Sequence, residues 1–248
     1  MAARAGSSNY RAWVVAIGLA AVFAAVRVVG TLGPVDLRWV MPLGFVSMAV
    51  LPFLLLDREA RRDAGFRLPP DMRGYGIALA SGAAAAFACY VLGAMLFGAT
   101  ADHWFVSIAN GYRRMMDTTG WDASRLHLVF TVPALVFSPI GEECFFRGYL
   151  QYALERRFSE RASTVAECAA FAVIHLCHHG LFLSAAGFGI RPLSGAIWML
   201  LMFGTAYSFA LLRKRTGSLL PAIVAHVAFN GVMNVTIFAW LWQTTAPK

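Results

Sequence analysis

The feature that most constrains this chain is the length of its uncharged runs. Residues 74–101, 192–212 and 216–247 contain no Asp, Glu, Lys or Arg. Each run is long enough to cross a bilayer as a helix, which takes about 20 apolar residues. Of the 248 residues, 59% are hydrophobic and only 14% are charged, whereas about a quarter of a soluble domain is charged. We therefore expect an all-α fold, a polytopic transmembrane helical bundle, with residues 1–248 forming one integral membrane domain.

The apolar segments predict seven to eight spans. We expect seven of them at residues 12–32, 39–56, 75–99, 126–141 with a continuation beyond 141, 163–179, 193–212 and 218–242. The amphipathic segment 103–118 is expected to be an interfacial or re-entrant helix, or the eighth span. Residues 1–125 then form N-terminal spans, and residues 126–242 form a core that carries the polar motifs described below.

The net charge of +8 is compatible with binding nucleic acid or with orientation in a membrane. The basic residues lie in short clusters between apolar runs and are not interleaved with aromatic residues as in single-strand binders. We therefore expect a lipid bilayer as a partner, and no nucleic acid. The four cysteines lack the CxxC spacing of zinc ribbons.

The distribution of Lys and Arg predicts the orientation of the chain. With a cytoplasmic N-terminus, thirteen basic residues fall inside and six outside, the latter being Arg38, Arg113, Arg114, Arg125, Arg191 and Lys248. The chain is thus predicted to be a multi-pass protein of the cell membrane, inner or plasma, with its N-terminus in the cytoplasm. Arg27 lies near the outer end of the first span, where we expect its side chain to snorkel to the interface without a further role.

Three isolated ionisable residues are expected at similar depths in the bilayer. Glu142 lies fourteen residues before Arg156, and His175 lies fourteen after Arg161. At 1.5 Å per helical residue both are about 21 Å from the basic end, and His226 is about 16 Å from it. Because buried ionisable residues normally face one another or a water-filled cavity, we expect one shared polar pocket.

Spacing within each helix adds polar neighbours to that pocket. Glu143 and Arg147 are four residues apart and can pair along one face, which leaves Glu142 to point elsewhere. The same spacing joins His226 to Asn230, and it joins His175 to Phe171, whose ring is expected to wall the pocket. A buried Glu–Arg pair or an intramembrane Asn can also simply hold helices together, but the whole set favours a site.

Two nearby features are interpreted as structural. His175 and His179 have the H-x-x-x-H spacing of a metal-binding pair, but His178 and His179 follow the span and are expected at the interface. Cys144 is a possible nucleophile with His175 as its base. It points about 200° away from Glu142, at about 100° per residue, and is therefore expected to pack in the core.

Four motifs in order give the chain a family resemblance. They are "EECFFR" at 142–147 followed by "GYLQ", "FAVIH" at 171–175, the glycine-containing "MFGTAYSFALL", and "HVAFN" at 226–230 preceded by "RTGSLLPAIVAH". Over residues 130–235 the chain resembles the CPBP family of intramembrane endopeptidases. That family includes CAAX prenyl proteases of the Rce type and bacterial Abi-type enzymes linked to bacteriocin processing and immunity.

The resemblance implies an enzyme that hydrolyses a peptide bond in a membrane-tethered protein or peptide. Glu142 would activate a water with help from His175, and His226 and Asn230 would form an oxyanion hole. Glu143, Arg147 and Phe171 would be supporting residues. The resemblance implies no cofactor in this reading, while an older view of the family makes zinc possible, with Glu142, His175 and His226 as its ligands.

Other classes of function stay open at the level of sequence. A non-proteolytic immunity or scaffold protein could use the same motifs only to join helices, although an intact set of polar residues argues against it. A proton-coupled transporter would be expected to show internal repeats, and none is evident. The composition and small size indicate a bacterial protein, which favours a bacteriocin-like precursor or a C-terminal sorting tail over a prenylated substrate.

Overall fold

The computed structural model describes residues 2–184 and 187–243, and within them the chain is almost entirely helical. The elements are α1 (Ala2–Leu32), η1 (Val35–Leu37), α2 (Val40–Leu55), α3 (Arg58–Asp63), α4 (Arg73–Phe97), α5 (Trp104–Met115), α6 (Ala123–Glu142), η2 (Glu143–Leu150), α7 (Gln151–Glu155), α8 (Glu160–Ile174), η3 (His175–Cys177), β1 (Leu181–Ser184), β2 (Gly187–Ile190), α9 (Pro192–Thr216), α10 (Leu220–Thr236) and η4 (Ile237–Leu241). The predicted all-α class is confirmed, apart from one short hairpin.

Six helical segments of the described residues are long and apolar enough to cross a membrane. They are Ala12–Leu32, Val35–Leu55, Arg73–Phe97, Ala123–Glu155, Pro192–Thr216 and Leu220–Leu241. The chain is therefore a multi-pass membrane protein, as its composition predicts. Two segments expected as spans or possible spans, 163–179 and 103–118, are not in this set.

The segment expected as a span at 163–179 departs from prediction because its helix stops early. The α-helix α8 has only 15 residues and ends at Ile174, where the turn η3 begins. Gly180 then adopts a φ of +111°, which a side chain would strain, and the chain enters the hairpin β1–β2 in which Leu181 lies opposite Ile190. At 103–118 the structure has α5, whose 12 residues extend only about 18 Å.

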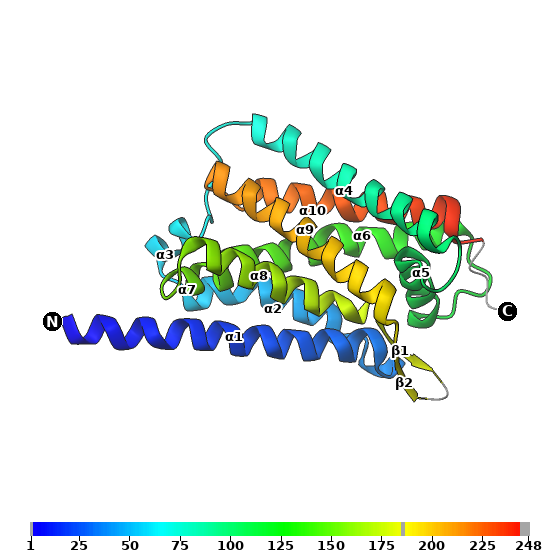
Figure 1. Cartoon of the computed structure of the whole chain (residues 1–248), viewed down its shortest axis with the longest axis horizontal. Helices are drawn as coiled ribbons and strands as arrows, with labels where there is room; N and C mark the ends of the chain where they lie inside the picture. The colour runs from blue at the N-terminus through cyan, green and yellow to red at the C-terminus, as the bar shows by residue number, and fades with distance from the viewer. Residues whose placement is uncertain (1, 185–186, 244–248) are drawn as a thin grey trace.

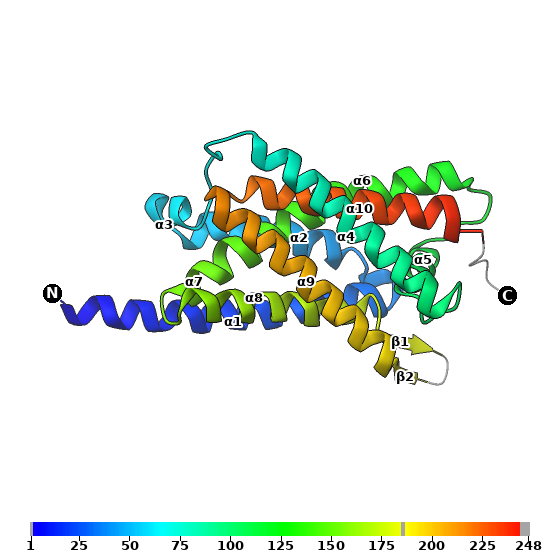
Figure 2. The same ribbon diagram turned by 45° about the horizontal axis from the view of Figure 1, so that its top comes forward.

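The helices lie side by side along the long axis of the molecule. In Figure 1, α1 runs along one edge and α4 along the opposite edge, with the other long helices between them. In Figure 2, α4 crosses the bundle obliquely in front of α10. The helix α10 contacts α4, α6 and α9, and α8 packs on α9. The core consists of two buried clusters, one mainly from α4, α5, α9 and α10 and one mainly from α1, η2, α7, α8 and α9. The motif-bearing elements η2, α8 and α10 all contribute to these clusters.

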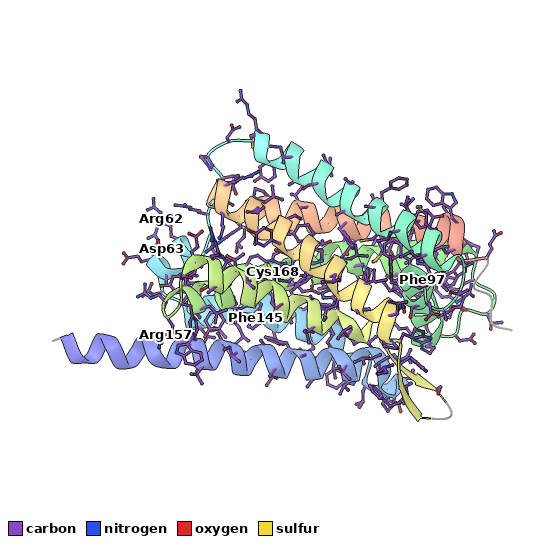
Figure 3. The ribbon with its side chains drawn as sticks, in the orientation of Figure 1. Arg62, Asp63, Phe97, Phe145, Arg157 and Cys168 are labelled. Atoms are coloured by element: carbon purple, nitrogen blue, oxygen red, sulfur yellow. The ribbon has the colours of Figure 1, made fainter. Side chains whose placement is uncertain are left out.

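The two ends of the bundle differ in charge. The end that holds the beginning of α1, the helix α3 and the α7–α8 turn carries basic clusters, and Figure 3 shows Arg62, Asp63 and Arg157 there. Phe97, α5 and the hairpin lie at the opposite end. This gathering of basic segments at one end matches the distribution from which the orientation was predicted, while the orientation itself stays a prediction.

Small residues allow two pairs of helices to approach closely. A Cβ at Gly82 in α4 would collide with the backbone of Ala225 in α10, and one at Gly141 in α6 would collide with the backbone of Phe45 in α2. Such contacts between backbones are the usual way in which membrane helices pack tightly. They hold α10 and α6 in place directly beside His226 and Glu142.

The segment that contains both glutamates is a π-helix. The helix predicted at 126–141 with a continuation beyond 141 runs through α6, η2 and α7, but η2 has π geometry and all eight of its residues are buried. Isolated π segments occur frequently at functional sites because they redirect side chains. Sequence periodicity predicted the helix but not this change of winding.

Candidate active site

A single cavity brings most of the predicted site residues together. It has a volume of about 570 Å³, and side chains from α1, α2, α5, α6, α8, α9, α10 and the hairpin line it. His175, His226, Asn230 and Phe171 are among the lining residues. Glu142 lies directly behind them, fully buried and in contact with the lining residues Ser138, His175 and Arg27. The predicted convergence of three helices on one pocket is thus present.

Glu142 and His175 face each other with unused acceptor atoms. His175 Nε2 lies 3.7 Å from Glu142 Oε2, which finds no hydrogen-bond partner among the described residues. His175 Nδ1 lies 2.7 Å from the carbonyl oxygen of Phe171. A carbonyl only accepts, so Nδ1 carries the proton, and in a neutral ring Nε2 presents a lone pair. Stacking on Phe171, with ring centroids 4.3 Å apart, holds the imidazole in this orientation.

Arg27 is the main correction to the sequence prediction. It does not snorkel: the side chain is buried, forms an ion pair with Glu142 Oε1, and donates to His178 Nε2 from Nε at 3.1 Å. Ser138 also donates to Glu142 Oε1, at 2.9 Å. Ionisable residues inside a span normally face the bundle interior and pair with one another, as Arg27 and Glu142 do. The sequence signal was a lone arginine in an apolar segment, which is itself a marker of function.

A second buried cluster of charged residues adjoins the site. Arg147 pairs with Glu143 at 3.1 Å, as the spacing predicts, and also with Glu167 of α8 at 3.3 Å. His226 Nδ1 lies 2.8 Å from the same oxygen of Glu143. The Arg147 guanidinium covers the Phe171 ring at 4.1 Å. These contacts tie the π segment to α8 and α10 and set the direction in which His226 points.

Glu167 was missed by sequence reasoning. It lies four residues before Phe171 on the same face of α8, and His175 follows directly after the end of that helix. An acidic residue at that spacing from a motif is the signal that could have found it.

Asn230 lines the cavity one helical turn beyond His226 on α10. One Nδ2–H donates to the carbonyl oxygen of Ala134 in α6 at 2.9 Å, which fixes the amide. The same nitrogen has a second N–H, and the residue lines the cavity. His226 stacks on Phe209 with centroids 5.4 Å apart. Both residues are thus held rigidly at the cavity wall.

Part of the chain that carries these residues matches a known family. Residues 124–232 match the family model described as Rce1-like, type II CAAX prenyl endopeptidase. This part of the chain is a domain of the CAAX protease family. All of the predicted site residues lie within the matched range. No curated protein and no solved structure matches the chain significantly.

The match to residues 124–232 supports an intramembrane peptidase domain in general terms, within a multi-pass membrane protein. The matched range resembles the predicted core at 126–242, although the division of the chain into 1–125 and 126–242 stays a prediction. Arg27 lies outside the matched range and still contacts Glu142. The N-terminal spans therefore belong physically to the site of this CAAX protease domain.

Two histidines expected at the interface are instead inside the CAAX protease fold. His178 lines the cavity and accepts from Arg27, and His179 is fully buried beside Trp104. Both histidines lie inside the protein and not at the membrane interface, because α8 ends early and the chain folds back over the cavity. Cys144 is buried and does not line the cavity, in agreement with its predicted packing role.

The zinc alternative was tested against the arrangement of potential ligands. The described residues contain no group of three or more His, Cys, Asp or Glu placed to hold a metal ion. Of the three proposed ligands, Glu142 is already paired with the Arg27 guanidinium, and His226 Nδ1 is directed at Glu143. Arg27 pairs with Oε1 of Glu142, while Oε2 has no partner among the described residues and faces His175 Nε2. No step below is routed through a metal.

Proposed function

We propose that this CAAX protease domain hydrolyses a peptide bond of a membrane-tethered protein or peptide by glutamate-activated water. The observation that carries the proposal is the opposition of Glu142 Oε2 and His175 Nε2 at 3.7 Å, both as acceptors. A water about 2.8 Å from each atom can donate one hydrogen to the carboxylate and the other to the imidazole. Its oxygen lone pair is then free to face the cavity.

The proposed reaction uses no covalent intermediate with the enzyme. The water oxygen attacks the carbonyl carbon while its proton passes to the Glu142–His175 pair, in the manner of a general base. Collapse of the tetrahedral intermediate breaks the C–N bond, and the same proton moves to the leaving amine. Arg27 and Ser138 occupy Oε1 of Glu142, which leaves Oε2 as the oxygen that acts.

Asn230 and His226 are the proposed donors to the oxyanion. Asn230 has its second Nδ2–H available at the cavity, since the first is held by Ala134. His226 donates to Glu143 from Nδ1, so donation from Nε2 as well requires an imidazolium, for which Glu143 is the adjacent counter-charge. In other enzymes, loss of one such donor lowers kcat by about 10²–10³.

The proposed substrate is a membrane-associated peptide segment, and the apolar cavity walls supplied by Phe130, Phe137 and Phe229 suit it. A bacteriocin-like precursor or a C-terminal sorting tail is the class that we favour. We further propose that the protein lies in the cell membrane with its basic end in the cytoplasm, in keeping with the Lys/Arg bias. No cofactor is part of this proposal.

The test compares protein termini in cells that express the wild type or Glu142→Gln at matched levels. Mass spectrometry of membrane proteins is expected to show new termini with the wild type only. Glu59→Gln is the matched control, because Glu59 is an exposed glutamate on α3, remote from the cavity, and should retain the wild-type termini. Identical profiles for wild type and Glu142→Gln, with both proteins folded, would contradict proteolysis and favour a scaffold role.

A further inference from the structure

Three arginines from separate parts of the chain line the same cavity as the catalytic residues. Arg38 lies between η1 and α2, Arg114 lies near the end of α5, and Arg191 precedes α9. These elements gather at the end of the bundle where α5 and the hairpin lie (Figure 2). The three arginines belong to the minority of basic residues that are predicted to lie outside the cytoplasm. The preference for basic residues on the cytoplasmic side therefore does not explain their presence.

The positive charge of this arginine cluster is only partly balanced. Arg191 forms an ion pair with Asp102 at 3.4 Å. Arg38 has two buried donor atoms, Nε and Nη1, without a hydrogen-bond partner among the described residues. All three arginines line the one cavity. Burial, followed by the positive charges of Arg38 and Arg191, lowers the pKa of Arg114. Among the described residues, Asp102 is the one carboxylate within ion-pair distance of these three arginines, which leaves room for a further anion.

The distance from the arginine cluster to the catalytic centre follows from the helices between them. Tyr112, two residues before Arg114, stacks on Phe130 with centroids 4.5 Å apart and donates to Asn234 Oδ1 at 2.8 Å. Phe130 is twelve residues from Glu142, or about 18 Å along α6, and Asn234 is eight from His226, or about 12 Å along α10. An extended peptide covers about 3.3–3.6 Å per residue, so four or five residues reach from the catalytic centre to Tyr112, which lies two residues before Arg114 on α5.

We propose that Arg38, Arg114 and Arg191 form a subsite for a carboxylate of the substrate peptide, four to five residues from the bond that is cut. The carboxylate is either an Asp or Glu side chain or the C-terminus of the substrate. Arginine suits this role because its planar fork donates in pairs to a carboxylate. The apolar wall between the two places selects apolar residues in the intervening segment. The inference rests on the proposed function, because it names a feature of the substrate of that site.

Binding of defined probes tests the subsite without measuring hydrolysis. The full chain, purified in non-ionic detergent at low salt, is titrated with a fluorescent N-dodecanoyl peptide of alanine and leucine. Mass spectrometry after the titration checks that the peptide has not been cleaved. One form carries an Asp near an amidated C-terminus, a second carries Asn and a free C-terminal carboxylate, and a third carries Asn with an amidated C-terminus and is neutral. Fluorescence anisotropy then gives Kd for each form.

We expect at least one charged probe to bind the wild type about tenfold or more tightly than the neutral probe, which corresponds to about 1.4 kcal/mol. The form that gains affinity identifies the source of the carboxylate. Arg38→Gln/Arg114→Gln should bind the charged and neutral probes equally. Arg125→Gln is the matched control, since Arg125 is an exposed arginine that pairs with Asp122 and does not line the cavity. Added salt should reduce the preference.

The proposal is overturned if the wild type fails to distinguish the charged from the neutral probes, or if the preference survives the double substitution. It is also overturned if native mass spectrometry shows an anionic phospholipid bound to the wild type and lost from the double variant while neither charged probe is preferred. That result would assign the arginines to a lipid phosphate. All of these outcomes are independent of whether Glu142→Gln abolishes new termini in cells, so failure here leaves the protease proposal standing.

Discussion

At the scale of single residues, Arg27 has the largest effect on how the site is understood. It contacts Glu142 and His178 but not the position proposed for the water, so it acts through Glu142 as a positioning residue. Arg27→Gln is expected to lower kcat by about tenfold or more with KM nearly unchanged, because only the orientation of the base is lost. Arg27→Lys keeps the charge and should restore part of kcat. Loss of KM with kcat intact would contradict this role.

Asn230 offers a second test at the residue scale. Asn230→Asp replaces the donating amide by a carboxylate of the same shape, which removes the proposed donor to the oxyanion. We expect kcat to fall by about 10²–10³ while the protein remains folded. Steady-state kinetics with a purified substrate measures the change, and circular dichroism checks folding. A variant with wild-type kcat would rule out Asn230 as an oxyanion donor.

Spacing along the chain predicted the pairs that lie on one helix and missed those between distant segments. Glu143 with Arg147, and Phe171 with His175, follow from a separation of four residues. The partners Arg27 and Glu142 are 115 residues apart, and no local pattern reports that contact. Similarly, Glu167 becomes part of the site only because α8 packs against the π segment that carries Arg147.

At the scale of elements, the close packing of α4 on α10 positions His226. Gly82→Leu would force a side chain against the backbone of Ala225, adjacent to His226, and separate the two helices. We expect a clear fall in thermal stability in detergent together with loss of activity. The matched control is Gly76→Leu on the same helix, where a Cβ would meet no atom within 4 Å. Equal stability of the two variants would contradict the packing argument.

Element boundaries were the least predictable part of the fold. Hydropathy predicted the long helices closely, since the expected spans at 12–32, 75–99 and 193–212 overlap Ala12–Leu32, Arg73–Phe97 and Pro192–Thr216. At 163–179 the same apolar composition produces a shorter helix, a turn and the start of a hairpin. Hydropathy measures apolar content and does not register where His175 and Gly180 end a helix, because their conformation is set by contacts with Trp198 and Gly195.

At the scale of the whole molecule, the uneven distribution of basic residues predicts how the protein sits in the membrane. Residues at the two ends of the bundle should be accessible from opposite sides. We expect Arg62→Cys to react with a membrane-impermeant maleimide only after cells are opened, and Asp117→Cys to react in intact cells. The four native cysteines are buried, which limits background labelling. The reverse pattern would invert the predicted orientation and place the arginine cluster on the cytoplasmic side.

The central claim, that Glu142 activates water for proteolysis without a metal, is tested most directly by single-turnover kinetics. The purified full chain is given a peptide that spans the identified cleavage site, in buffer containing a strong zinc chelator. We predict undiminished cleavage by the wild type and a loss of about 10²–10⁴ in rate for Glu142→Gln, the range for a general base. Cleavage that stops with the chelator and returns with zinc, or that persists in Glu142→Gln, would contradict the account.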